Sequence, residues 1–215
     1  MKVVALIPCK DLDRGKSRLA GCLGPRERIA LCTFFLRRTL GVAIEAFGHG
    51  CVRVVTGDHN AVAIAAEQGV GAIADGAGGL NGALENGRAW MTSEAADCAA
   101  LILPIDLPLA TPAALLRITA EPHDAVIVPD ENLDGTNILC LAPEALRQFR
   151  FCYGRHSYAR HAAAAQAIGI DMRRIDDPEL MFDVDHPEQY RRRVQGEPAW
   201  RVIIGGERCT FNESW

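Results

Sequence analysis

The sequence lacks the features that mark several large classes of protein. None of its apolar runs approaches the roughly 20 residues that a membrane-spanning helix needs. Only three of its 215 residues are lysine, and the formal net charge is −4. A chain with this charge has no general attraction for nucleic acids or anionic membranes. Any site for phosphate groups must therefore be local.

The cysteines are numerous, but their spacing predicts neither a metal site nor a disulfide framework. Eight cysteines are scattered along the chain, and no two of them form a CxxC motif. This pattern argues against zinc and favours reduced thiols. Cys9 resembles a lipoprotein cleavage site, but only five apolar residues precede Pro8 and charged residues follow at once. We therefore expect a cytoplasmic protein.

Alternating apolar runs and amphipathic segments predict an α/β fold. Residues 3–7 form a continuous apolar run, which is typical of a strand buried on both faces of a parallel sheet. Residues 26–47 place apolar side chains at helical spacing, with arginines between them. The other expected strands are residues 52–56, 70–73, 99–103, 125–128 and 138–141, and the other expected helices are residues 60–68, 80–91 and 112–119. One Rossmann-like domain follows, with a mostly parallel sheet flanked by helices.

The C-terminal part of the pattern is less regular. Ser157 is expected to cap an alanine-rich helix that ends at residue 168. A short apolar segment at residues 181–184 ends in Asp185, and another helix is expected near Pro187. These signals place carboxylates next to a helix start.

The domain is expected to cover residues 1–198, and residues 199–215 form a tail of unknown role. The tail contains an apolar stretch at residues 201–206, which suits either an edge strand or an interface arm. A homodimer is therefore one open alternative.

Three apparent motifs do not support a site. Residues 15–17, Gly-Lys-Ser, match the end of a Walker A loop, but Lys10 stands where that loop requires its first glycine. Residues 69–74 match a degraded dinucleotide motif, yet they follow an expected helix instead of a strand. His156 and His161 are five residues apart, off a common helical face, so we interpret them as part of a helix surface.

A cluster of cations follows the first expected strand. Lys10, Arg14, Lys16 and Arg18 crowd this loop in a chain with few lysines. Such a loop can simply be a solvated basic surface. In open α/β sheets, however, ligands bind beyond the carboxyl ends of the strands, so these cations could also neutralise a triphosphate.

Carboxylates follow two other apolar segments. Asp106 comes directly after a buried strand, and Asp183 and Asp185 end the short segment near the C-terminus. Carboxylates at two such ends could hold Mg²⁺ between protein and phosphates. Asp185 could instead cap the following helix. Together with the basic loop, the carboxylates form a minimal constellation for metal-assisted nucleotide chemistry.

Eight motifs, in order between about residues 3 and 190, resemble the guanylyltransferases of deazaflavin coenzyme F-420 biosynthesis. Each motif alone is unspecific, but their common order is specific. They are Ile7-Pro8-Cys9-Lys10, Lys16-Ser17-Arg18-Leu19, Gly79-Leu80-Asn81-Gly82-Ala83-Leu84, Asp106-Leu107-Pro108-Leu109, Pro129-Asp130, Gly135-Thr136-Asn137, Ser157-Tyr158 with His161, and Asp183-Val184-Asp185.

The resemblance implies a nucleotidyltransferase fold similar to that of molybdopterin guanylyltransferases. It implies transfer of GMP from GTP to 2-phospho-L-lactate, phosphoenolpyruvate or 3-phospho-D-glycerate, with release of pyrophosphate. Asp106 and Asp185 would hold Mg²⁺, and Lys16 and Arg18 would act with them as catalytic residues at the triphosphate. The remaining implied residues are Pro8, Lys10, Leu80 and Asn81 at the nucleotide, and Thr136, Asn137, Gly154 and Ser157 at the acceptor acid.

Departures from the family pattern cluster near the acceptor. Residues 129–135 lack the arginine and second glycine often found there, and the loop at residues 152–156 is unusually polar and bulky. Arg155, His156 and Tyr158 could pair with the free hydroxyl of 3-phospho-D-glycerate. The arginine-rich, lysine-poor composition also resembles proteobacterial members, some of which use that acid. It is therefore narrowly preferred over 2-phospho-L-lactate and phosphoenolpyruvate.

Two other classes of protein remain open. A sugar-phosphate nucleotidyltransferase or a glycosyltransferase would share the fold and the metal, but it would need a sugar-sized pocket. A non-catalytic nucleotide sensor would keep the basic loop without needing two carboxylates. The metal ligand could be Asp183 or Asp185, because these side chains point to opposite faces if the segment is extended.

Overall fold

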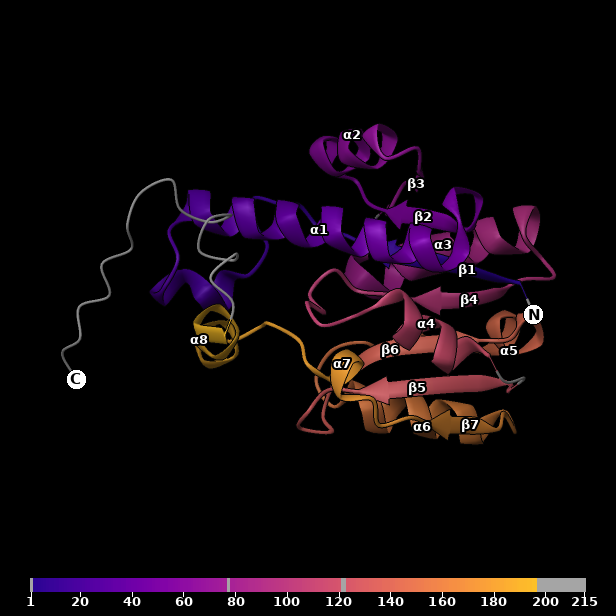
Figure 1. Ribbon diagram of the computed structural model, residues 1–215. Coiled ribbons are helices and arrows are strands. Elements are labelled where there is room, and N and C mark those ends of the chain that lie inside the picture. Colours follow the sequence, from indigo (N-terminus) through magenta and orange to yellow (C-terminus); the bar gives the residue numbers. More distant parts are fainter. Residues whose placement is uncertain (1, 77, 121–122, 197–215) are drawn as a thin grey trace.

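The computed structural model describes residues 2–196 except 77 and 121–122, and it confirms an α/β fold (Figure 1). Its seven-stranded sheet has the order β3-β2-β1-β4-β6-β5-β7. β6 is antiparallel to both of its neighbours, and all other strand pairs are parallel. The sheet is therefore mostly parallel, as the sequence predicts.

Most of the secondary structure lies close to the expected ranges. The strands are β1 (Val3–Pro8), β2 (Val52–Val55), β3 (Gly71–Ile73), β4 (Ala99–Ile102), β5 (Ala125–Pro129), β6 (Thr136–Leu141) and β7 (Met172–Arg174). The α-helices are α1 (Pro25–Phe47), α2 (His59–Glu67), α3 (Gly79–Glu94), α4 (Pro112–Thr119), α5 (Pro143–Gln148), α6 (Ser157–Ala167), α7 (Pro178–Met181) and α8 (Pro187–Gly196). Two short 3-10 helices are η1 (Ser17–Gly21) and η2 (His49–Cys51).

β1 is apolar throughout because helices cover both faces of the sheet. Its residues alternate between the two layers, as the two-residue period of a strand requires. Ala5 and Ile7 pack in the core that α1, α2 and α4 cover. Val4 and Leu6 pack in the core that α3, α5 and α6 cover. The sheet is thus the middle layer of three (Figure 1).

A third apolar cluster lies beyond the carboxyl ends of the strands. It joins η1, the N-terminal half of α1, the segment at residues 182–184 and α8 through Leu19, Phe35, Phe182 and Tyr190. Within this arrangement the Val184 N–H donates to the Asp106 carbonyl at 3.1 Å. The cluster therefore brings the acidic segment to the end of β4.

The start of α6 differs from the expectation. His156 is the N-cap residue, in a left-handed conformation with φ 56°, and it makes no side-chain capping hydrogen bond. Ser157 is instead the first helical residue and is buried. The interpretation of His161 as a helix-surface residue is also wrong, because its side chain is fully buried.

The acidic segment also differs from the expected strand end. Met181 ends α7, and residues 182–185 form no regular secondary structure. Asp185 does not cap α8 with its carboxylate. Instead, the Gln189 Oε1 of α8 reaches back and accepts from the Asp185 and His186 N–H groups, which precede the helix, at 2.8 and 2.7 Å.

The predicted tail at residues 199–215, including the stretch at 201–206, lies outside the described residues. The boundary at residue 198 therefore stays a prediction. Within the described ranges, no helix is both long and apolar enough to cross a membrane.

Candidate active site

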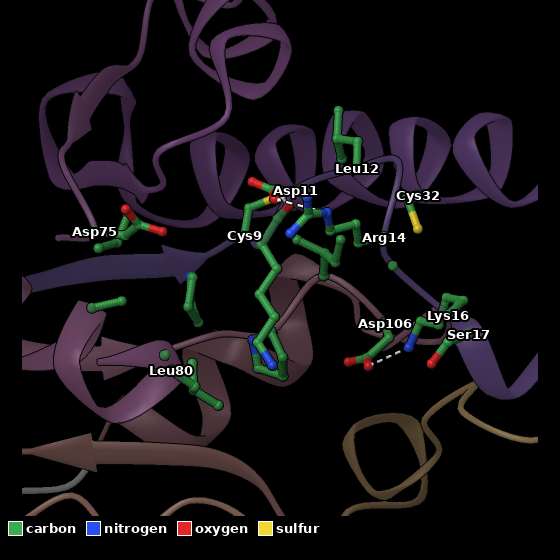
Figure 2. Close-up of a pocket in the computed structure, with 18 of the residues that line it drawn as sticks. Cys9, Asp11, Leu12, Arg14, Lys16, Ser17, Cys32, Asp75, Leu80 and Asp106 are labelled. Carbon is green, nitrogen blue, oxygen red and sulfur yellow. Dashed lines mark hydrogen bonds and ion pairs between the residues drawn. The ribbon is translucent and has the colours of Figure 1, made fainter. Parts of the chain in front are cut away.

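A cavity of about 590 Å³ lies beyond the carboxyl ends of β1 and β4 (Figure 2). Its walls come from the loop after β1, the first turn of α3, the loop after β4 and Asp185. This is the position at which open α/β sheets bind ligands, because the loops leave the sheet there on both sides. The sequence placed its basic loop and Asp106 at this edge, and the structure brings them together.

Lys16 lies between two carboxylates at one side of the cavity. Its Nζ is 2.5 Å from the Asp106 Oδ2 and 2.7 Å from the Asp185 Oδ1 (Figure 2 shows the contact with Asp106). The Lys16 backbone is left-handed, with φ 52°. Gly15 lets the loop pack on α1, since a Cβ there would lie 2.6 Å from the Cys32 Sγ. The loop thus holds a buried ammonium against two acidic segments.

The charges of this cluster depend on one another. Burial opposes the charge of the Lys16 ammonium, but Asp106 and Asp185 outweigh that effect and raise the pKa of Lys16 above its usual value. Burial likewise opposes the charge of Asp185, but Lys16 and Arg18 together hold its pKa below the usual value. Arg18 Nη1 lies 3.1 Å from the Asp185 Oδ2.

Asp183 has a different environment from Asp185. Its Oδ1 accepts a hydrogen bond from the Gln189 Nε2 at 3.1 Å, and its side chain does not line the cavity. Burial, followed by the charges of Asp106 and Asp185, raises the pKa of Asp183 to about 7. Asp185 is therefore the residue of this pair that faces the cavity.

Asp106 and Asp185 suit a divalent cation in combination with phosphates. Both carboxylates already approach a single cationic atom, the Lys16 Nζ. In the part of the chain that the structure describes, no group of three His, Cys, Asp or Glu side chains forms a metal site. Mg²⁺ is commonly held by one or two carboxylates while substrate phosphates and water complete its shell. The pair fits such a cation if Lys16 moves toward the phosphates.

The residues expected to bind the nucleotide divide into those that line the cavity and those that do not. Pro8, Lys10 and Leu80 line the cavity together with Lys16 and Asp106. Lys10 is exposed and makes no ion pair with any described residue, so its charge is available to a ligand. Arg18 and Asn81 are absent from the cavity wall.

Asn81 is instead bonded to the loop before α6. Its Nδ2 donates to the Tyr153 carbonyl at 3.1 Å, and its Oδ1 accepts from the Tyr153 N–H at 2.9 Å. Both ends of one amide side chain are thus used by the backbone of a single residue. No pattern in the sequence indicates this contact.

The four acceptor candidates gather around the starts of β6 and α6, outside the described cavity wall. Thr136, Asn137 and Ser157 are buried, whereas Gly154 is exposed with φ 123°, a conformation that favours glycine. The Ser157 N–H donates to the Gly154 carbonyl at 3.1 Å. Their roles at the acceptor stay predictions.

Thr136 and Asn137 are consecutive in β6 and bond in different directions. The Thr136 Oγ1 lies 3.0 Å from the Nδ1 of His161, which is on α6. The Asn137 Nδ2 donates to the Leu180 and Met181 carbonyls of α7 at 3.0 and 2.9 Å. Asn137 thereby holds the helix that precedes the acidic segment.

His161 is a central residue that the sequence interpretation missed. Its Nε2 accepts from the Cys152 N–H at 2.8 Å, so Nδ1 carries the ring proton and donates to the Thr136 Oγ1. A signal was present, because Ser157, His161 and Ala165 are spaced four residues apart and all three are buried. Burial, with a smaller effect from Arg160, lowers the pKa of His161 to about 4.

We expect His161 to make the stability depend on pH. The unfolded imidazole takes up a proton near pH 6.5, whereas the native one does so only near pH 4. The unfolded state therefore binds more protons in this window, and stability falls as the pH falls. The contribution of His161 to the free energy of unfolding should decrease by about 2 kcal/mol between pH 7 and pH 5.

The measurement is urea unfolding of wild type and His161→Gln at both pH values. The difference between the two proteins isolates His161 from other titrating groups, and His59→Gln, an exposed histidine on α2, is the matched control. Equal pH dependence in wild type and His161→Gln would contradict the buried neutral imidazole.

Comparison with known proteins identifies the family of this chain. The family model "Guanylyl transferase CofC like" matches residues 1–193. A phosphoenolpyruvate guanylyltransferase from Rubrobacter xylanophilus is 39% identical, over 89% of this chain and 93% of the relative.

Solved structures show the same fold. A nucleotidyl transferase from Methanothermobacter thermautotroptrophicus has a TM-score of 0.63 at 15% identity, over 91% of this chain and 97% of that chain. Rv0371C from Mycobacterium tuberculosis H37Rv, in complex with manganese, has a TM-score of 0.58 at 19% identity, over 92% and 100% of the two chains. With the family model matching nearly the whole described chain, the protein is an enzyme, a nucleotidyltransferase that belongs to the CofC-like guanylyl transferase family.

Proposed function

We propose that the enzyme transfers GMP from GTP to the phosphate of a small phosphorylated carboxylic acid and releases pyrophosphate. The observation that carries this proposal is the convergence of Lys16, Asp106 and Asp185 at one side of a cavity that Lys10 also lines. Three lysines are present in the whole chain, and two of them lie at this cavity. Such a concentration of the scarce cations suits a triphosphate.

The proposed reaction needs no general base. A phosphate monoester has a second pKa near 6, so it is largely dianionic at neutral pH and can attack the α-phosphorus of GTP directly. The main task of the protein is to hold two anions in line despite their repulsion. Lys10, Lys16 and Arg18 would reduce this repulsion by contacting the phosphates. The buried, neutral His161 is consistent with a mechanism that uses no catalytic histidine.

We propose that Asp106 and Asp185 hold Mg²⁺ when the nucleotide is bound. The bound ion would withdraw charge from the phosphates and favour departure of pyrophosphate. The manganese complex of a protein with the same fold supports a divalent cation. Asp106 and Asp185 would then exchange the Lys16 ammonium for the ion, while Lys16 turns to a phosphate oxygen.

We propose phosphoenolpyruvate as the acceptor, in place of the 3-phospho-D-glycerate that the sequence narrowly favoured. The name of the 39% identical relative supports this choice. Two of the three polar side chains that favoured 3-phospho-D-glycerate also have other partners. The His156 Nδ1 contacts the Asp134 Oδ1 at 2.5 Å, and the Arg174 guanidinium lies over the Tyr158 ring at 5.8 Å. We also propose that the enzyme acts in coenzyme F-420 biosynthesis, that it is cytoplasmic and that it forms a homodimer.

The test is a competition assay with GTP, Mg²⁺ and equal amounts of phosphoenolpyruvate, 2-phospho-L-lactate and 3-phospho-D-glycerate, with the products identified by mass. The expected main product is the guanylylated enolpyruvate adduct. A preferred acid should gain at least about tenfold in kcat/KM, since a misplaced phosphate or an unpaired hydroxyl in the site costs 1 to 3 kcal/mol.

Two further arms separate the alternatives. Sugar 1-phosphates test for a sugar-phosphate nucleotidyltransferase, and pyrophosphate release tests for catalysis as opposed to nucleotide sensing. A dominant product from another acid would change the acceptor and leave guanylyl transfer intact. If no acid forms an adduct, the proposed function is wrong.

A further inference from the structure

The loop at residues 151–156, here called the acceptor loop, has a buried base and an exposed tip. Phe151 and Cys152 are buried, whereas residues 154–156 are exposed. The tip contains Gly154, which the resemblance places at the acceptor acid. Within the described chain, the N–H groups of Gly154 and Arg155 donate to no protein acceptor. The tip can therefore offer backbone donors to an anion, provided that its base is held in place.

Two side chains hold the base of the acceptor loop. One precedes the loop in the sequence, and the other follows it. Asn81 of α3 bonds the N–H and the carbonyl of Tyr153, and His161 of α6 accepts from the Cys152 N–H. The His161 ring also packs edge-on against the Tyr153 ring, with centroids 4.7 Å apart and planes at 74°. Consecutive residues of the loop are thus fixed by two helices.

We propose that Asn81 and His161 are positioning residues, which hold the acceptor loop so that its tip can bind the acceptor acid. The proposal rests on the proposed function only in naming that acid as the ligand. It reassigns Asn81, because its amide is engaged by the loop and does not line the nucleotide cavity. Leu80, the preceding residue of α3, does line that cavity. One helical turn therefore lines the nucleotide cavity with Leu80 and holds the acceptor loop with Asn81.

His161 extends the same positioning to Thr136. Because the His161 Nδ1–H donates to the Thr136 Oγ1, the hydroxyl proton of Thr136 is free to donate elsewhere. The imidazole thus sets the hydrogen-bond direction of a second acceptor candidate. α3 gives further support to the chain before the loop, since the Arg88 Nη1 donates to the Phe149 carbonyl at 3.1 Å.

The kinetic test compares Asn81→Asp with wild type for both substrates. The aspartate keeps an acceptor for the Tyr153 N–H but sets a carboxylate against the Tyr153 carbonyl. We expect the KM for the acceptor acid to rise about tenfold, as for one lost buried hydrogen bond. The KM for GTP should change by less than about twofold, because the substitution removes no contact with the nucleotide.

The matched control is Asn86→Asp, which makes the same substitution on α3. The Asn86 Nδ2 also donates to a backbone carbonyl, but that carbonyl belongs to Ala74, which is outside the acceptor loop, and the contact is exposed. Its two KM values should stay near those of wild type. His161→Asn, which retains an amide donor for Thr136 and loses the acceptor for Cys152, should repeat the selective effect of Asn81→Asp.

Hydrogen exchange measured by mass spectrometry provides a readout that does not need turnover. The Cys152 and Tyr153 amides, which donate to His161 and Asn81, should exchange faster in His161→Asn and Asn81→Asp, respectively, than in wild type or Asn86→Asp. If Asn81→Asp raises the KM for GTP but not the KM for the acceptor acid, Asn81 binds the nucleotide and the proposal is wrong. Unchanged exchange in the loop would also overturn it.

The two proposals fail in distinguishable ways. If wild type turns over none of the phosphorylated acids, the proposed function is wrong, and the exchange experiment alone decides whether Asn81 and His161 hold the loop. If wild type is active and the loop exchange is unchanged in the variants, only the positioning proposal is wrong.

Discussion

Asp106→Asn and Asp185→Asn are each expected to lower kcat by at least about 100-fold, the usual effect of removing one electrostatic group from a transferring phosphate. Each carboxylate contacts the Lys16 Nζ at the cavity. In either variant Lys16 keeps one carboxylate and the asparagine can still accept from it, so the fold should persist. The measurement is pyrophosphate release at saturating GTP and acceptor, with circular dichroism to confirm folding.

Asp183→Asn is the matched control for this experiment. Asp183 belongs to the same segment but is bonded to Gln189 and is absent from the cavity wall. It should lose less than about tenfold in kcat, because it makes no direct contact with the phosphates in the proposed complex. Near wild-type turnover of Asp185→Asn together with loss in Asp183→Asn would exchange the roles of the two residues.

Lys16→Met and Lys10→Met are expected to weaken the use of GTP by comparable amounts but to differ in stability. Each removes one cation from the cavity, so kcat/KM for GTP should fall by at least about tenfold. Lys16 is buried between carboxylates, whereas Lys10 is exposed and has no ion pair among the described residues. Only the Lys16 variant removes the cation that contacts the half-buried Asp106, and it leaves Asp185 paired with Arg18 alone.

The Lys16→Met variant should therefore unfold more easily. We expect a loss of about 2 kcal/mol, below the roughly 3 to 5 kcal/mol of fully buried pairs. The expected loss is smaller because the Asp106 and Asp185 side chains are 22% and 37% exposed, so water partly screens their charges. Urea unfolding near pH 7 measures it. Equal stability of the two lysine variants would show that Lys16 does not neutralise this cluster.

The sequence predicted most of the fold because the central strands and main helices have simple signals. β1 and α4 are bounded by prolines and contain strong apolar patterns, and both lie where they were expected. β7 was missed because Met172–Arg174 is only three residues long and mostly exposed, so it carries no apolar pattern. It is a strand because its backbone pairs with the edge of β5. α5 has only six residues and was missed for a similar reason.

The site could be predicted in part for a physical reason. Lys16 and Asp106 are 90 residues apart in sequence, yet both follow strands that end at the same edge of the sheet. The rule that ligands bind beyond the carboxyl ends of strands in open sheets therefore predicts that these two residues lie close together. The roles of Asn81 and His161 depend on contacts between side chains and a loop without regular structure. The four-residue spacing of Ser157, His161 and Ala165 indicates one face of α6, but no periodicity in the sequence records contacts with the loop.

The opposite directions of Thr136 and Asn137 restrict how this enzyme can change in length. The pairing of β5 with β6 shifts register at this point, because Val128 pairs with Ile138 and Pro129 pairs with Thr136, so that Asn137 is the extra residue of a β-bulge. Because a bulge sets the direction of its side chains, inserting or deleting one residue here would redirect both side chains. Thr136 would lose His161, and Asn137 would lose the α7 carbonyls, in a single event. The exposed turn at residues 131–134 bears no such constraint on register. Natural or engineered length variation should therefore be tolerated in that turn and excluded from the strand that follows it.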